Sequence, residues 1–485
     1  CFIFSIPFFA QNTWTGTVDD KWSKKENWSG EVPGPADDVL IPSGFTVTLD
    51  TPADILSITV QGNSTLNVTS ALVIANPSEF DDNVVVNWSS GDLSGGGILL
   101  NKGTINMSFN SFDLSASTTL NNPGTLNLIG GAAMFINTNG VINNSGTGII
   151  DFKTNGTSIT KAGPAPNALI NDGLIKTSFP NDSDSAFIAA AIINRDGVFQ
   201  VEKGSLNLNN TIVSLEGGIY NVSAGASLNL NSPTTVIGTL TGNVFGDLNW
   251  NDDLIVSANA VFDFKGNQTI NCTGNLEGGG TLTNLTTINQ IGGSALQING
   301  ATTLDNEGLI EITNGPGISI GTNSILNNPL GSVIDIQTDN AEISALGGAP
   351  NVLNNWGLIK LSFQDPTDQS IFRAQLNNND GTIQIDHGTL WLFNANTTLT
   401  NGTYNVATGA KLQWTLPLTI SGSLSGNLDG IFGWEGDLLV PTSASFNFTG
   451  NGSVEWKTKR LAGGGTLTNA HTITTISGSN KIIDD

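Results

Sequence analysis

The chain has 485 residues, of which 58 are glycine, 38% are hydrophobic and only 12% are charged. That hydrophobic share is ample for a core, so the low complexity does not indicate disorder. The net charge is −24, from 41 acidic against 17 basic residues. We therefore exclude nucleic acid and anionic membranes as partners, because both repel an acidic protein.

The first ten residues, 1–10, form an apolar run that ends at Ala10. The run resembles the tail of a secretory signal peptide, and a buried first strand is the alternative. No later stretch reaches the roughly 18 apolar residues that a membrane span requires. We expect a secreted, monomeric segment without membrane insertion. After cleavage Cys272 would be the one remaining cysteine, which we interpret as an inert strand residue.

Residues 11–60 are rich in tryptophan, with Trp14, Trp22 and Trp28 inside fifteen residues. The first coil of a stacked fold exposes strand edges and apolar core, and both invite aggregation. We therefore interpret this segment as an N-terminal cap. An aromatic platform that stacks on sugar rings is the alternative. In residues 61–94 short strand-like runs begin to recur at regular spacing, and we assign these residues to the first coils.

A long repeat with a spacing of 184 residues organises the rest of the chain. Residues 171–179 (NDGLIKTSF) return as 355–363 (NWGLIKLSF), and residues 278–284 (GGGTLTN) return unchanged as 463–469. Repetition at a fixed period indicates a repeat architecture. We call residues 95–278 copy 1 and residues 279–462 copy 2. Residues 463–485 read as the start of a third, truncated copy.

Each copy contains a shorter beat marked by the tract Asn-Asn-x-Gly. In copy 1 its glycines are 21, 22, 27 and 24 residues apart, at Gly103, Gly124, Gly146, Gly173 and Gly197. Alternating apolar residues between them indicate short strands. We predict an all-β fold, a right-handed parallel β-helix (β-solenoid) of about 20–27 residues per coil. Asparagine and glycine would form the corners, with asparagine amides bonding up the stack. Leucine, isoleucine and valine would face inward, with threonine, serine and asparagine outward. A β-sandwich array is the competing fold.

Two resemblances suggest where the protein acts. The tryptophan-rich segment 11–60 resembles the opening segment of large secreted surface proteins of the Bacteroidetes. The Asn-Asn-x-Gly coils resemble the β-helical repeats of bacterial adhesins of the filamentous haemagglutinin type. These resemblances imply export, followed by display or release at the cell surface.

Few ionisable residues recur in both copies. They are the pairs Asp151 with Asp335, Lys176 with Lys360, Asp196 with Asp380, Asp253 with Asp437, and Glu202 with Asp386. Their offsets from each coil's glycine predict that they spread around the coil, so no paired-carboxylate glycosidase site forms. Asp196 reads as a turn residue. We predict no catalytic residue, no cofactor and no metal site; a calcium site at Asp252-Asp253 or at Glu435 with Asp437 lacks a recognisable loop. The two histidines, His387 and His471, are not a pair kept by the repeat.

These patterns favour a secreted, non-enzymatic cell-surface solenoid that acts as the stalk or adhesive region of an adhesin-like protein. Its partners would be surface glycans or host and other cell-surface ligands. The alternative is a carbohydrate-active β-helix enzyme, such as a polysaccharide lyase or hydrolase, or a glycan-binding module. Ice binding is a weaker alternative, because Thr-x-Thr pairs do not recur coil after coil.

Overall fold

The computed structural model describes residues 11–108, 111–164, 166–210, 212–266, 269–457, 459–476 and 481–484. The apolar run at residues 1–10 lies outside the described residues. The chain divides into two compact units. Unit 1 contains the residues up to Thr234 with Leu240–Leu248, and unit 2 contains Thr235–Thr239 with Asn249–Asp485.

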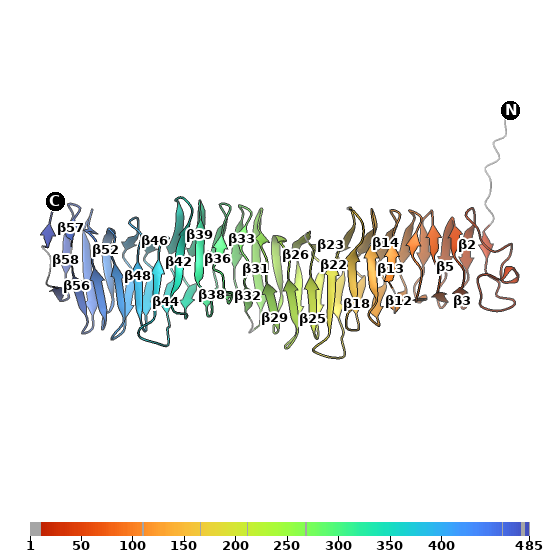
Figure 1. Cartoon of the computed structure of the whole chain (residues 1–485), viewed down its shortest axis with the longest axis horizontal. Helices are drawn as coiled ribbons and strands as arrows, with labels where there is room; N and C mark the ends of the chain where they lie inside the picture. Colours follow the sequence, from red (N-terminus) through yellow and green to blue (C-terminus); the bar gives the residue numbers. More distant parts are fainter. Residues whose placement is uncertain are drawn as a thin grey trace, which may run out of the picture. The chain divides into compact units, whose positions relative to one another are not determined.

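Strands stack on strands in parallel throughout each unit (Figure 1). One coil of unit 1 consists of β14 (Thr119–Asn122), β15 (Thr125–Ile129) and β16 (Ala133–Ile136). These strands pair in parallel with β17 (Val141–Asn144), β18 (Ile149–Phe152) and β19 (Ser158–Lys161) of the next coil. Each coil therefore adds one strand to each of three sheets, and the chain makes about 20 such turns. The predicted parallel β-solenoid is confirmed.

Side-chain alternation along the strands builds the core. In β17 the side chains of Ile142 and Asn144 are buried, whereas Val141 and Asn143 are only partly buried. Most strands repeat this pattern, because successive side chains of a strand point to opposite faces. A coil cannot bury its apolar side alone, so its neighbours in the stack complete the core. The described residues contain no α-helix and one 3₁₀ helix, η1 (Lys25–Asn27).

A ladder of five asparagines runs inside copy 1, where the sequence predicted outward-facing asparagine. Each amide donates through Nδ2 to Oδ1 of the asparagine in the next coil, at 2.6–2.9 Å. All five side chains are fully buried: Asn101, Asn122, Asn144, Asn171 and Asn194. The ladder ends at Tyr220, whose hydroxyl accepts from Asn194 at 3.0 Å and donates to the carbonyl of Gly217 at 2.9 Å. Every amide nitrogen of the ladder thus has a partner, which makes an inward asparagine tolerable, and the Oδ1 of Asn101 at its first position is left without one.

Copy 2 contains the same ladder at equivalent positions. Its Nδ2–Oδ1 distances are 2.6–3.0 Å, along Asn284, Asn306, Asn328, Asn355 and Asn378. Tyr404 terminates this ladder as Tyr220 terminates the first, and its hydroxyl accepts from Asn378 at 2.8 Å. Corresponding strands, such as β14 and β37 (Thr303–Asn306), hold the same part of each ladder. The 184-residue sequence repeat therefore corresponds to a repeat of the buried asparagine ladder.

The ladder explains why the tract that contains Asn194 ends in glycine. A Cβ on Gly197 would lie 2.2 Å from Nδ2 of Asn171 and 2.6 Å from Oδ1 of Asn194. The glycine is needed because the ladder amides occupy the space that a side chain would take. Asp196, next to it, adopts the left-handed conformation with φ of 58°. Its equivalent Asp380 does the same at 60°, which confirms the turn interpretation.

Tyr220 and Tyr404 are the two tyrosines of the chain. Burial raises the pKa of both hydroxyls, and the asparagine hydrogen bond opposes this only in part. The folded state therefore favours the neutral hydroxyl. This contribution to stability is fully present below the unfolded pKa of about 10 and is lost as the pH rises above it. We expect tyrosinate absorbance to appear near pH 10 in urea but at higher pH, together with unfolding, in native protein. Equal titration curves would contradict buried tyrosines.

The tryptophan-rich segment packs against the first coil of unit 1. Strand β1 (Asn12–Thr13) pairs in parallel with β2 (Asp38–Ile41). The amide of Trp22 donates to the carbonyl of Thr48 at 2.9 Å, in β3 (Thr46–Leu49). Trp14, Trp22 and Trp28 are 1–5% exposed, and their rings meet edge to face at 4.6–4.9 Å. Buried rings cover the end of the coil and leave no ring face for a sugar.

Candidate functional site

The structure brings Asp151 and Lys176 together, contrary to the expectation from the sequence. They are register partners on β18 and β21 (Leu174–Thr177). Oδ2 of Asp151 lies 3.6 Å from Nζ of Lys176 and 3.2 Å from Nζ of Lys153. Ser178 donates to Oδ1 of Asp151 at 2.5 Å. The offsets counted from each coil's glycine gave a wrong prediction here. The coils differ in length, and loops of different length between the strands take up the difference, so the strands stay in register.

In copy 2 the equivalent groups share a face but pair differently. Asp335 and Lys360 are register partners, yet Nζ of Lys360 lies 3.4 Å from Oδ2 of Asp386. Asp335 accepts from Ser362 at 2.5 Å and from Gln337 at 3.0 Å. In copy 1, Glu202 accepts from Gln200 at 2.7 Å. In both copies, therefore, a serine hydroxyl and an amide or ammonium group donate to the recurring carboxylate (Asp151 or Asp335), as in a structural network of polar groups.

The remaining predicted groups are also engaged in local contacts. Asp253 accepts from Asn275 at 2.8 Å, whereas Asp437 pairs with Arg460 at 3.0 Å. The Arg460 guanidinium holds the pKa of Asp437 below its usual range. Cys272 is buried in β32 (Ile270–Cys272), and burial raises the pKa of its thiol. A buried thiol with a raised pKa is a poor nucleophile.

Within the described residues, no three histidine, cysteine or acidic side chains cluster where they could hold a metal ion. Over the same residues, no helix has the length and hydropathy to span a membrane. We predict that folding is independent of metal, because hydrogen-bonded ladders and apolar packing account for the core. The thermal midpoint should be the same with and without EDTA. A fall of more than about 5 °C, equivalent to several kcal/mol for a chain of this length, would contradict this prediction.

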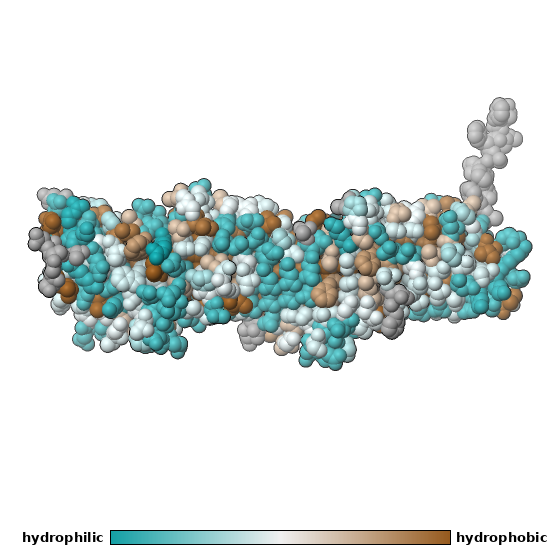
Figure 2. All heavy atoms as spheres, in the orientation of Figure 1, coloured by the Kyte–Doolittle hydropathy of each residue, from teal (hydrophilic) through white to brown (hydrophobic). Residues whose placement is uncertain are grey.

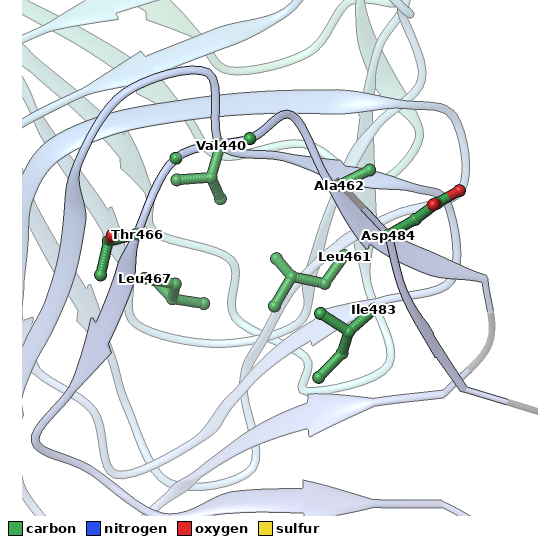
Figure 3. Close-up of a pocket in the computed structure, with 9 residues that line it drawn as sticks. Val440, Leu461, Ala462, Thr466, Leu467, Ile483 and Asp484 are labelled. Carbon is green, nitrogen blue, oxygen red and sulfur yellow. The ribbon is translucent and has the colours of Figure 1, made fainter.

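A cavity of about 320 Å³ lies at the last described coil of unit 2 (Figure 3). Its lining includes Val440, Leu461, Ala462, Gly464, Gly465, Thr466, Leu467, Ile483 and Asp484. The copy 1 equivalents of three lining residues, Val256, Leu276 and Leu282, are fully buried, because further strands pack on them. The cavity therefore lies on the inner side of a coil, and its lining residues are of the kind that form the hydrophobic core.

Most of the visible surface is hydrophilic, with hydrophobic residues in small groups (Figure 2). In copy 1, outward asparagines form two rows near its end. Asn229 donates to Asn207 at 2.9 Å, and Asn231 donates to Asn209 at 3.0 Å. In unit 2, Asn271 donates to Asn249 at 3.0 Å. These outer amides bond to one another as the inner ones do.

Copy 2 replaces every member of these two rows. The first outer row, defined by register partners on four successive strands, is Trp391, Gln413, Gly433 and Glu455. The second outer row lies two positions further along the chain, directly after each strand ends, and consists of Phe393, Thr415, Glu435 and Lys457. The strands are β48 (Thr389–Leu392), β51 (Lys411–Trp414), β53 (Ile431–Trp434) and β56 (Ser453–Trp456). We call the two rows together the copy-2 face.

Gly433, a buried residue without a side chain, lies in the middle of the first outer row. A Cβ on Gly433 would lie 3.4 Å from Cγ2 of Ile431, 3.5 Å from Nε2 of Gln413 and 3.7 Å from Cβ of Glu455. Gln413 is only 3% exposed, and its buried Nε2 has no hydrogen-bond partner. The buried hydroxyl of Thr415 also lacks one. Each unpaired buried donor costs about 1–3 kcal/mol. Buried groups without a partner also occur elsewhere, as at Trp14 and Ser324, but here two of them lie in neighbouring rows of one face.

Charged and aromatic groups lie around Gly433 on the copy-2 face. Nζ of Lys457 lies 3.2 Å from Oε1 of Glu435 and 3.8 Å from Oε2 of Glu455. Trp391 is partly buried, and Phe393 is 40% exposed. The guanidinium of Arg373 lies 5.1 Å from the Phe393 ring centroid. Aromatic surface, carboxylates and an ammonium group therefore occur together on one stretch of parallel sheet.

A stack of indoles supports the copy-2 face from inside. Trp414 and Trp434 are stacked with ring centroids 6.1 Å apart, and Trp434 and Trp456 are 5.4 Å apart. Copy 1 has Leu230, Trp250 and Cys272 at these positions. Large, closely packed rings hold the strands of copy 2 rigidly, which suits a preorganised binding surface.

Sequence reasoning missed the copy-2 face because it searched for ionisable residues shared by the two copies. The signal lay in the differences: eight outward positions, seven asparagines and Thr273 in copy 1, all change in copy 2. Compared with known proteins, the chain matches no family model. A search of curated proteins also finds no match.

Proposed function

We propose that this chain is a secreted β-solenoid of a bacterial cell surface and serves as the stalk or adhesive region of an adhesin-like protein, without catalysis of its own. The resemblance of residues 11–60 to openings of Bacteroidetes surface proteins supports export. The acidic surface and the strongly paired coils suit a scaffold outside the cell.

One observation carries the proposal: the two copies share their interior and differ on their exterior. The inner ladders from Asn101 to Tyr220 and from Asn284 to Tyr404 are the same, whereas the outer rows of copy 2 are new. A scaffold requires a repeated interior, and an adhesive surface is free to vary. An enzyme would require one assembled site.

Surface display is the direct test. Antibodies raised against residues 11–485 should label intact cells of the bacterium that makes the protein, and external protease should remove the label. Cells lacking the gene should attach less to surfaces that carry the ligand. Labelling that appears only after the cells are permeabilised would contradict the proposal.

The second candidate is a carbohydrate-active enzyme, favoured by Glu435 and Glu455 on adjacent coils. Both carboxylates approach Lys457, at 3.2 and 3.8 Å. A glycosidase requires two carboxyl groups across a scissile bond. Release of reducing or unsaturated ends from polysaccharides, abolished by Glu435→Gln or Glu455→Gln, would establish this alternative.

A further inference from the structure

We propose that the copy-2 face binds a neutral polysaccharide, with the sugar lying over Trp391 and its hydroxyls bonded by Gln413, Glu435, Glu455 and Lys457. The inference rests on the adhesive role proposed above and names the partner of that surface. It begins from the contrast with copy 1, whose equivalent rows contain seven asparagines and Thr273, with amide-to-amide bonds such as Asn229 to Asn207 and Asn231 to Asn209.

Sugar rings have an apolar face of C–H groups and an edge of hydroxyls that both donate and accept. The copy-2 face offers a match for each part. Trp391 provides partly exposed aromatic surface, and such rings combine large contact area with low conformational entropy cost. Glu435 and Glu455 accept hydrogen bonds, while Lys457 between them donates.

Gln413 and Thr415 strengthen the case, because their polar atoms are buried without a partner. The terminal torsion of a glutamine is soft, so the amide, which is 3% exposed, can turn toward a hydroxyl that approaches beside Gly433. Gly433 is itself buried and the nearest side-chain atoms lie 3.4–3.7 Å from where its Cβ would be, so the hydroxyl requires a small outward shift of these side chains. A bound hydroxyl would relieve the unpaired donor, which a packed apolar partner could not do.

Charge selects a neutral polymer over an acidic one. The two glutamates and one lysine leave the face with a net negative charge, and the chain carries −24 in total. Uronic acid or sulfated polymers would be repelled. The stacked strands also favour an extended chain, because register partners repeat along the stack at about 4.8 Å.

The test compares the intact chain with two variants that restore the copy 1 residue. Trp391→Asn removes the ring, and Gly433→Asn adds a side chain beside Gln413. Both should fold, because copy 1 carries Asn207 and Asn249 at these places and a Cβ on Gly433 meets no clash. Circular dichroism and the thermal midpoint confirm folding. Asn207→Ala and Asn229→Ala, in the outer row of copy 1, are the matched controls.

Affinity gels containing laminarin, xyloglucan, galactomannan or soluble starch measure binding, with polygalacturonate as the acidic polymer. We expect at least one neutral polymer to retard the chain and both copy-2 variants to bind roughly tenfold or more weakly, with the controls unchanged. Retardation by polygalacturonate alone, or equal retardation of the folded variants, would overturn the inference. Polymer cleavage that depends on Glu435 would replace it with the enzyme. Absence of binding to every polymer would also overturn the inference and leave the stalk as the proposed role. The display experiment tests that role separately.

Discussion

Removing one whole coil should leave a folded protein, whereas removing half of that coil should not. Residues 119–140 form one period, because Thr119 and Val141 are register partners. Their deletion joins Thr118 to Val141 at the same point of the coil. The inner ladder then closes from Asn101 to Asn144, and the buried positions stay in phase. Since stability is close to a sum of local terms, losing one of about 20 turns should change the unfolding midpoint only slightly.

Deletion of residues 119–129 is the smaller change and the matched control. It removes β14 and β15 but leaves β16, which must still pair with β13 (Ser111–Leu114). Only residues 115–118 and 130–132 would then link the two strands. Seven residues span at most about 25 Å, too short for a path around the coil. We expect this variant to aggregate or to lose its strand signal in circular dichroism. Equal behaviour of both deletions would contradict the coil-by-coil architecture.

Asn144→Leu should destabilise the protein far more than Asn143→Leu, although the two residues are neighbours of the same type. Asn144 donates to Asn171 at 2.7 Å and to the carbonyl of Leu174 at 3.2 Å, and it accepts from Asn122 at 2.9 Å. Leucine fills the site but leaves buried partners unpaired. We expect a loss of about 3 kcal/mol or more in the free energy of unfolding, measured by urea denaturation.

Asn143 belongs to an outer row and donates to Asn121 at 2.8 Å in a partly buried position. Water can replace that bond, so Asn143→Leu should cost about 1 kcal/mol or less. Asn328→Leu, at the equivalent position of copy 2, should match Asn144→Leu because the ladder is the same there. Similar losses for Asn143 and Asn144 would show that the buried ladder adds no more than a surface amide.

Several features of the fold could be predicted from the sequence alone because they depend on local rules. Strand alternation and a period of 21–27 residues indicate stacked parallel coils. Asparagine and glycine indicate corners, since few other residues adopt positive φ. The left-handed Asp196 and Asp380 follow from this rule. The 184-residue repeat predicts equivalent strands in the two copies, such as β17 and β40 (Ser324–Asn328).

Only the tertiary structure showed how the inward asparagines are satisfied and which residues lie side by side. Alternation puts Asn144 on the same face as Ile142, but the sequence does not show the partners that a buried amide requires. Asp151 and Lys176 meet because the connecting loops absorb an uneven number of residues, which offsets along the chain do not reveal. The copy-2 face likewise joins Trp391 and Glu455, 64 positions apart in the sequence. Contacts between coils depend on the strand register, which is carried through the three corners of each coil. The number of residues in each corner is set by packing.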